Sequence, residues 1–90
     1  MKIPSSLKIG GHTISIKMGS LDGKLGESDY DKGLITIDKN SPQSIQESTL
    51  IHEVIHFLNT TLGDSEMGHS LIDSLSEQLY QVLKDNNLLK

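Results

Sequence analysis

Apolar and polar residues alternate in the first half of the chain, which is the pattern of half-buried β-strands. The glycine pair at 10–11 separates two such runs, at 7–9 and 14–16, and this predicts a first hairpin. A further run at 34–37 predicts another strand, with residues 24–27 as its hairpin partner. Together these strands predict a small antiparallel β-meander.

Apolar residues in the second half of the chain recur instead at helical spacing. A first helix is predicted to begin near Pro42 and to end at Gly63, a natural C-cap. A second helix is predicted to begin at Asp64 or Ser65 and to end at 85–87. The expected core stripes are Ile51, Ile55, Leu58 and Leu62 on the first helix and Leu71, Leu75, Leu79 and Val82 on the second. The fold class that follows is α+β, a β-meander followed by two antiparallel helices.

Length and composition restrict the class of protein. Ninety residues form one domain, with the meander at 1–41 and the two-helix part at 42–90. The formal charge is −4 and every basic residue is lysine, so nucleic-acid readout, which leans on arginine, is not expected. The absence of cysteine excludes disulfides, a thiolate nucleophile and cysteine-ligated zinc. No apolar run approaches the roughly 20 residues of a membrane span, and residues 1–6 lack a signal-peptide core, so we expect a cytoplasmic protein without a membrane partner.

The strongest chemical signal is the HExxH pattern at residues 52–56. On a helix, His52 and His56 lie on one face, so both imidazoles can bind one Zn²⁺ ion. Glu53 lies about 100° round the helix from the first histidine and can act as general base on a zinc-bound water. A solvated helix face is the alternative, but positions 50–62 contain no lysine and are apolar around much of the helix. We therefore predict one zinc ion per chain.

A third zinc ligand is expected from the second helix, where His69, Asp73 and Glu77 are spaced by four residues. His69 is the favoured ligand, because an imidazole with a carboxylate one turn away suits a metal ligand and its hydrogen-bonding partner. Asp73, Glu77 and Glu66 remain alternatives as the ligand. It is also open whether these side chains are simply solvated, with Glu66 as a charge at the start of the helix.

Residues 49–58 resemble the active-site helix of gluzincin-type metallopeptidases, and residues 79–86 are similar to a helix end found in very small HExxH proteins of phages and prophages. Those proteins are akin to the minigluzincins and, more remotely, to the ImmA/IrrE metallopeptidases. The resemblance spans about residues 9–86. It implies a zincin-like zinc metallopeptidase in the cytoplasm of a bacterium or a phage-infected cell.

The resemblance also implies roles on the second helix. In gluzincins the third zinc ligand is a glutamate, often followed four residues later by an aspartate that orients a zinc-bound histidine. Carried across, the ligand position falls on His69 and the orienting position on Asp73. A histidine therefore stands where the family has glutamate, which zinc accepts equally well.

The reaction that the resemblance implies is hydrolysis of a peptide bond in a protein or peptide substrate. Zinc held by the three histidines activates a water molecule, and Glu53 takes its proton and returns it to the leaving amine. Tyr80 is a candidate donor to the oxyanion or, equally, a partly buried core residue. The wider clan binds substrate along an edge strand, here either 34–38 or 24–27.

A binding module is the rival interpretation. Ninety residues leave little room for a substrate cleft, so the chain could be a zinc-stabilised, phage-type module with little or no peptidase activity. A third interpretation is a self-inhibited enzyme in which a tail occupies the zinc. A purely structural zinc site is closed by four protein ligands and needs no general base, so the presence of Glu53 favours the enzyme. The oligomeric state is left open.

Overall fold

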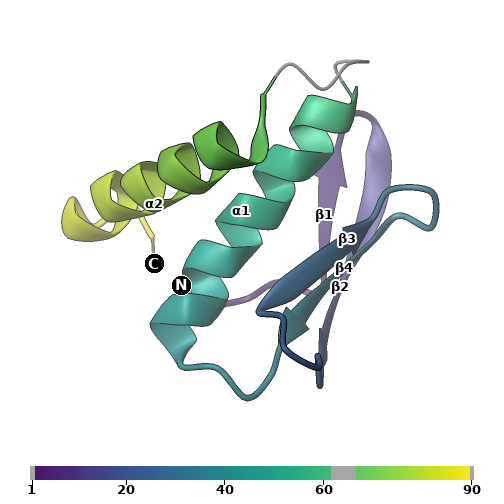
Figure 1. The fold of residues 1–90 in the computed structure, drawn as a ribbon, viewed down its shortest axis with the longest axis horizontal. Helices are drawn as coiled ribbons and strands as arrows, with labels where there is room; N and C mark the ends of the chain where they lie inside the picture. The colour runs from purple at the N-terminus through teal and green to yellow at the C-terminus, as the bar shows by residue number, and fades with distance from the viewer. Residues whose placement is uncertain (1, 62–66, 90) are drawn as a thin grey trace.

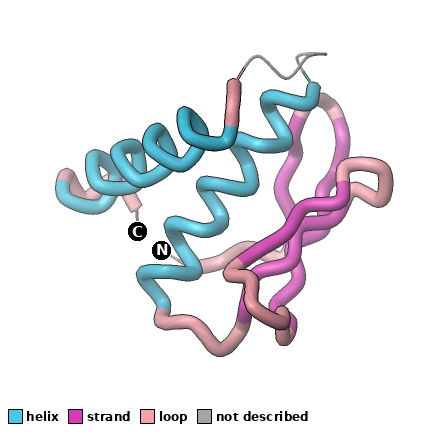
Figure 2. The backbone as a smooth tube through the Cα atoms, viewed as in Figure 1, coloured by secondary structure: helices cyan, strands magenta, loops and turns pink. Residues whose placement is uncertain are grey.

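The computed structural model describes residues 2–61 and 67–89. Its elements, in chain order, are β1 (Ser6–Ile9), β2 (His12–Gly19), β3 (Gly26–Asp29), β4 (Leu34–Asp38), α1 (Gln43–Thr61) and α2 (His69–Asp85). The strands form one sheet, α1 lies across a face of that sheet, and α2 packs on the side of α1 away from the sheet (Figures 1 and 2). The predicted α+β fold class is confirmed.

The sheet is mixed, so the prediction of a purely antiparallel meander is wrong. Its strand order is β1-β2-β4-β3, with antiparallel hairpins at both ends and a parallel pairing of β2 with β4 in the middle. The reason lies in the composition of the strands. Ile35 and Ile37 of β4 are fully buried, so this strand takes the centre, whereas the polar strand β3 takes an edge.

The core lies between the sheet and α1. On β2 and β4 the buried positions alternate with more exposed ones, as the period-two pattern predicts. The buried cluster consists of Ile9, Ile14, Ile16, Ile35, Ile37, Leu50 and Phe57. Five of these seven residues come from the strands, so α1 is fixed to the sheet through a small isoleucine layer.

The helix boundaries agree with the prediction at the start of α1 and the end of α2. α1 begins at Gln43, directly after Pro42, and α2 ends at Asp85. α2 begins at His69, later than predicted, because Gly68 before it has an extended backbone with φ −73° and ψ 166°. The predicted cap Gly63 and the positions Leu62, Asp64, Ser65 and Glu66 lie outside the described residues.

The predicted core stripe of α2 is wrong. Leu71, Leu75, Leu79 and Val82 are 39% to 53% exposed, whereas Ile72 and Ser76 are buried against α1. The small Ser76 lets the two helices approach closely, and its hydroxyl donates to the Ile72 carbonyl oxygen at 2.6 Å, which satisfies it where it is buried. On α1, Ile55 is buried as predicted, but Leu58 is 43% exposed.

Neither of the helices within residues 2–61 and 67–89 combines the length and the apolar composition that crossing a membrane requires.

Candidate metal centre

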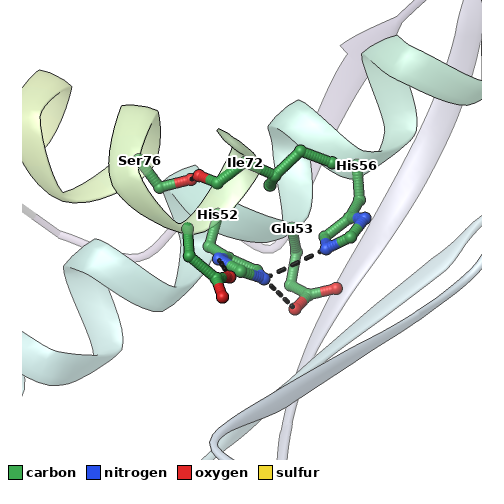
Figure 3. A network of polar contacts seen from close by, with 6 residues as sticks. His52, Glu53, His56, Ile72 and Ser76 are labelled. Atoms are coloured by element: carbon green, nitrogen blue, oxygen red, sulfur yellow. Dashed lines mark hydrogen bonds and ion pairs between the residues drawn. The ribbon is translucent and has the colours of Figure 1, made fainter. Parts of the chain in front are cut away.

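The two histidines of the HExxH pattern lie side by side on α1 (Figure 3). The Nε2 atoms of His52 and His56 are 3.1 Å apart, and their rings are 4.7 Å apart between centroids. Two nitrogen ligands of a tetrahedral zinc ion, each bound at 2.0–2.1 Å, are roughly 3.3–3.4 Å from each other. The separation of the two imidazole nitrogens therefore fits two ligands of one ion.

Burial sets the protonation state of His56. Removal from water lowers the pKa of this imidazole below its ordinary value, and the nearby histidines lower it further against the opposing charges of Glu53 and Asp73. The ring is therefore neutral at physiological pH. Neutral imidazole is the form that offers a lone pair to a metal.

Glu53 lies between α1 and the edge strand β3, where its side chain is buried. Its Oε2 is 3.9 Å from Nε2 of His52, so the carboxylate faces the same space as the histidine pair (Figure 3). β3 approaches α1 very closely at Gly26: a Cβ built there would meet Cγ2 of Thr49 at 2.5 Å and Cγ of Glu53 at 3.4 Å. Only glycine permits this approach, which holds the carboxylate against the strand.

Asp73 of α2 contacts the opposite side of the His52 ring. Its Oδ1 is 3.3 Å from Nδ1 of His52. When Nδ1–H donates to this carboxylate, the tautomer is fixed and the lone pair of Nε2 points toward His56. The contact is the one expected of a carboxylate that orients a metal-binding histidine.

His69 is the first residue of α2, and its ring is 5.0 Å from the ring of His56 between centroids. Its side chain is exposed. The structure thus brings the third predicted ligand next to the pair without completing a site. Within the described parts of the chain, no three His, Cys, Asp or Glu side chains converge closely enough to hold a metal ion.

Glu77 and Tyr80 follow Asp73 along α2. Glu77 is exposed and lines the same cleft as Asp73, one turn further along α2, and the alternative ligand Glu66 falls outside the described residues. The hydroxyl of Tyr80 donates to Oε1 of Glu47 at 2.7 Å and accepts from Nζ of Lys84 at 3.1 Å. This places Tyr80 in the contact between the two helices, more than a turn of α1 before the histidines.

A cleft runs between β3 and the two helices. Its larger part, about 430 Å³, is lined by Leu25, Ile45, Ser48 and Thr49, among others. A neighbouring part of about 390 Å³ extends to His56 and His69. Both parts share Lys24, Gly26, His52 and Glu53. Residues 24–27 are one of the two edges proposed from the sequence. Spacing along the chain did not indicate the facing wall of Ile45, Ser48 and Thr49, because that wall depends on how β3 meets α1.

The structure also distinguishes the two candidate edge strands. β4 lies inside the sheet, and β3 is an edge. The Asp38 amide donates to the Leu25 carbonyl oxygen at 2.8 Å, and antiparallel pairs alternate between bonded and non-bonded positions. With Gly26 opposite Ile37, the backbone groups of Gly26 and Ser28 face the open side of β3, toward the cleft.

Comparison of the chain with family models, with curated proteins and with solved structures finds no match. The chemistry of this cleft is therefore the basis on which a function can be inferred.

Proposed function

We propose that the chain is a zinc-dependent metallopeptidase, in line with its resemblance to the small gluzincin-like proteins. One observation carries the proposal: two imidazole nitrogens lie 3.1 Å apart, and the Glu53 carboxylate shares their cleft beside an open strand edge. Histidines that are merely solvated need neither a buried carboxylate beside them nor a partner on Nδ1. Both features are what metal-assisted hydrolysis requires.

His52, His56 and His69 are the proposed zinc ligands. Three neutral imidazoles form a donor set that zinc accepts with a fourth position open. The exposed side chain of His69 begins α2 beside His56, so its rotamer is not fixed by packing. Asp73 fits a ligand less well, because its carboxylate contacts Nδ1 of His52, the nitrogen on the far side of the ring from the pair.

Zinc held by His52, His56 and His69 would supply a Lewis acid that polarises the scissile carbonyl and lowers the pKa of water toward neutral pH. Glu53 accepts the proton of the attacking water and passes it to the leaving amine. Its burial between α1 and Gly26 keeps the carboxylate in one place through both transfers. The open backbone groups of Gly26 and Ser28 pair with an extended peptide, which presents its bonds to the histidine side of the cleft.

A zinc-stabilised binding module is the second candidate, and the incomplete convergence of three ligands within the described residues favours it. A structural zinc site is closed by four protein ligands and has no use for a nearby carboxylate that does not bind the metal. Oε2 of Glu53 is 3.9 Å from Nε2 of His52, and the cleft is open along β3. These two features favour the enzyme.

Glu53→Gln separates the two candidates. The variant is expected to keep its zinc, measured by mass spectrometry of the metal, and to lose hydrolysis of a quenched-fluorescence peptide library by at least about 100-fold. Asp31→Asn, which changes an exposed carboxylate that lines a different cavity, is the control and should keep both zinc and activity. Loss of zinc in Glu53→Gln would make Glu53 a ligand. A wild type that holds zinc and cleaves no peptide would favour the binding module.

A further inference from the structure

α2 presents an apolar surface to solvent along most of its length. Leu71, Leu75, Leu79 and Val82, the leucine face, are each 39% to 53% exposed. They fall within an arc of about 80° on a helix of 3.6 residues per turn. Among the described helices and strands α2 contacts only α1, and the four side chains of the leucine face stay exposed. A helix with one apolar stripe normally buries that stripe.

An apolar groove lies beside the leucine face. It has a volume of about 400 Å³, and its floor is α1. Leu79 belongs to both the groove and the leucine face, so the two surfaces are continuous. The lining residues from the two helices are Leu50, Ile51, Val54, Ile55, Leu58 and Leu79. Lys2, at the N-terminal wall, is the charged member of the lining among the described residues.

The leucine face and the groove are comparable in length. The leucine face spans residues 71–82, roughly 16 Å along a helix, and the groove follows α1 over 50–58, roughly 12 Å. A two-fold axis places the leucine face of each of two molecules in the groove of the other. A single surface that carries both shapes is therefore complementary to itself.

We propose that this surface is a homodimer interface, in which the leucine face of each α2 packs into the apolar groove of the other copy. The two helix pairs then form a four-helix bundle with the sheets on its outside. This arrangement covers both apolar surfaces of both copies, whereas a partner that fills the groove alone leaves most of the leucine face in water.

Size and charge support a second copy as the partner. The apolar side chains of the leucine face and the groove expose on the order of 400–500 Å², the size of the largest apolar patch on a typical monomer, which is often an interaction site. A stable interface covers roughly 800 Å² per partner, so the remainder would come from a polar rim around the patch. The chain carries a net charge of −4, yet among residues 2–61 and 67–89 no acidic side chain lies in the leucine face or lines the groove. Two acidic molecules can therefore meet here without like charges facing each other.

The proposed interface leaves the metal centre open. His69 and Asp73 lie more than about 120° from the middle of the leucine face round α2. The dimer therefore does not depend on zinc binding or on peptidase activity, and its failure would leave the proposed function untouched.

Sedimentation velocity of the full chain with Zn²⁺, from low to high micromolar concentration, tests the proposal. The expected species has twice the monomer mass of 9.9 kDa. Leu75→Glu should weaken dimerisation at least about 100-fold, because the charge enters a two-fold interface twice. Leu25→Glu changes a leucine that is 53% exposed in the other cleft, and His69→Ala removes the exposed histidine; both should stay dimeric.

Far-ultraviolet circular dichroism establishes that each variant is folded, and Val82→Glu provides a second substitution if Leu75→Glu is not. A wild type that sediments as a 9.9 kDa monomer at every concentration would overturn the proposal, and a different protein would then be the candidate partner for this surface. A dimer that persists in both Leu75→Glu and Val82→Glu, or one that His69→Ala dissolves through loss of a bridging metal, would overturn it as well.

Discussion

At the scale of single residues, the two nitrogens of the His52 ring show which neighbour can share a metal ion with it and which can only support it. Each ring has two nitrogens, and Asp73 contacts Nδ1 while His56 faces Nε2. A carboxylate on Nδ1 fixes the tautomer and the direction of the ring. A ligand must instead approach the space that the two Nε2 atoms share, and His69 is the α2 residue whose ring lies next to that space.

The resulting prediction concerns which substitution on α2 weakens zinc binding most. His69→Ala should weaken zinc binding far more than Asp73→Ala, for which about 10–100-fold is expected of a supporting group. His69→Glu should be the mildest change at that position, because zinc accepts either donor. Competition with a fluorescent zinc chelator gives the affinities.

X-ray absorption at the zinc edge provides an independent count, with three imidazoles expected. A spectrum with two imidazoles, or an Asp73→Ala defect as severe as that of His56→Ala, would make Asp73 the ligand.

The residues of the site differ in how far the sequence alone could locate them. The HExxH pair was predictable because its spacing is local to one helix. The contact of Asp73 with His52 depends on how α2 is rotated against α1, and the hydrogen bond from Tyr80 to Glu47 joins residues 33 positions apart. Spacing along the chain carries no information on either.

At the scale of elements, hydrophobic pattern located the strands and helices but not their mutual arrangement. The order β1-β2-β4-β3 follows from which strand is most apolar, whereas the prediction of a meander assumed that neighbours in sequence pair. On α2 the richest apolar stripe is exposed, since the contact with α1 is made through Ile72 and the small Ser76. Periodicity shows that a helix has an apolar stripe, but it does not show whether that stripe or another face of the helix is the one that becomes buried.

The contact of β3 with α1 should be sensitive to a single methyl group. Gly26→Ala places a Cβ 2.5 Å from Cγ2 of Thr49, so the strand must move away from the helix. We expect a loss of about 1–3 kcal/mol in the free energy of unfolding, measured with urea. Thr49→Ser, which removes that methyl group, should restore part of the loss.

Gly68→Ala is the matched control, because a Cβ there meets nothing within 4 Å and φ is −73°. Its stability should change by no more than about 0.5 kcal/mol. A Gly26→Ala variant as stable as this control would mean that β3 does not lie against α1.

The contact of α2 with α1 should depend on pH through Glu47. The hydrogen bond from Tyr80, helped by Gln43, lowers the pKa of Glu47 below its ordinary value of 4.5 despite burial. A lowered pKa stabilises the fold above pH 4.5, and this stabilisation is lost as the pH falls through the folded-state pKa. Tyr80→Phe should therefore destabilise the chain by about 1–3 kcal/mol at pH 7 and by less in acid.

Urea unfolding of the wild type and Tyr80→Phe at neutral and acidic pH measures this difference. Tyr30→Phe is the control, because the Tyr30 ring packs on Phe57 in another part of the molecule, and its effect should not vary with pH. An equal effect of Tyr80→Phe at both pH values would show that Glu47 gains nothing from the hydroxyl.

At the scale of the whole molecule, a chain of this length buries only a small core. A domain of this size covers roughly 60–70% of the surface that its unfolded chain exposes, and no disulfide is possible without cysteine. The buried cluster joins the sheet to α1, while α1 is the only one of the described helices and strands that α2 contacts. A zinc ion bound by residues of both helices would add a second link between them.

Zinc should therefore stabilise the whole fold. A ligand that binds the folded state alone adds about 2.7 kcal/mol at 100 times its dissociation constant, which for a domain of this size is a melting temperature higher by roughly 10–20 °C. We expect a chelator to lower the melting temperature of the wild type by that amount. His52→Ala and His56→Ala should melt at the lower temperature with or without chelator, because each removes a ligand.

His12→Ala provides the control for this measurement, since His12 lies on β2 and lines a different cavity from the other three histidines. It should keep one zinc ion per chain, counted by mass spectrometry of the metal, and the full response to chelator. Thermal unfolding followed by circular dichroism gives the melting temperatures. The metal proposal would be wrong if the wild type holds no zinc, takes none up and melts at the same temperature in chelator. The 3.1 Å separation of the two Nε2 atoms would then need another explanation.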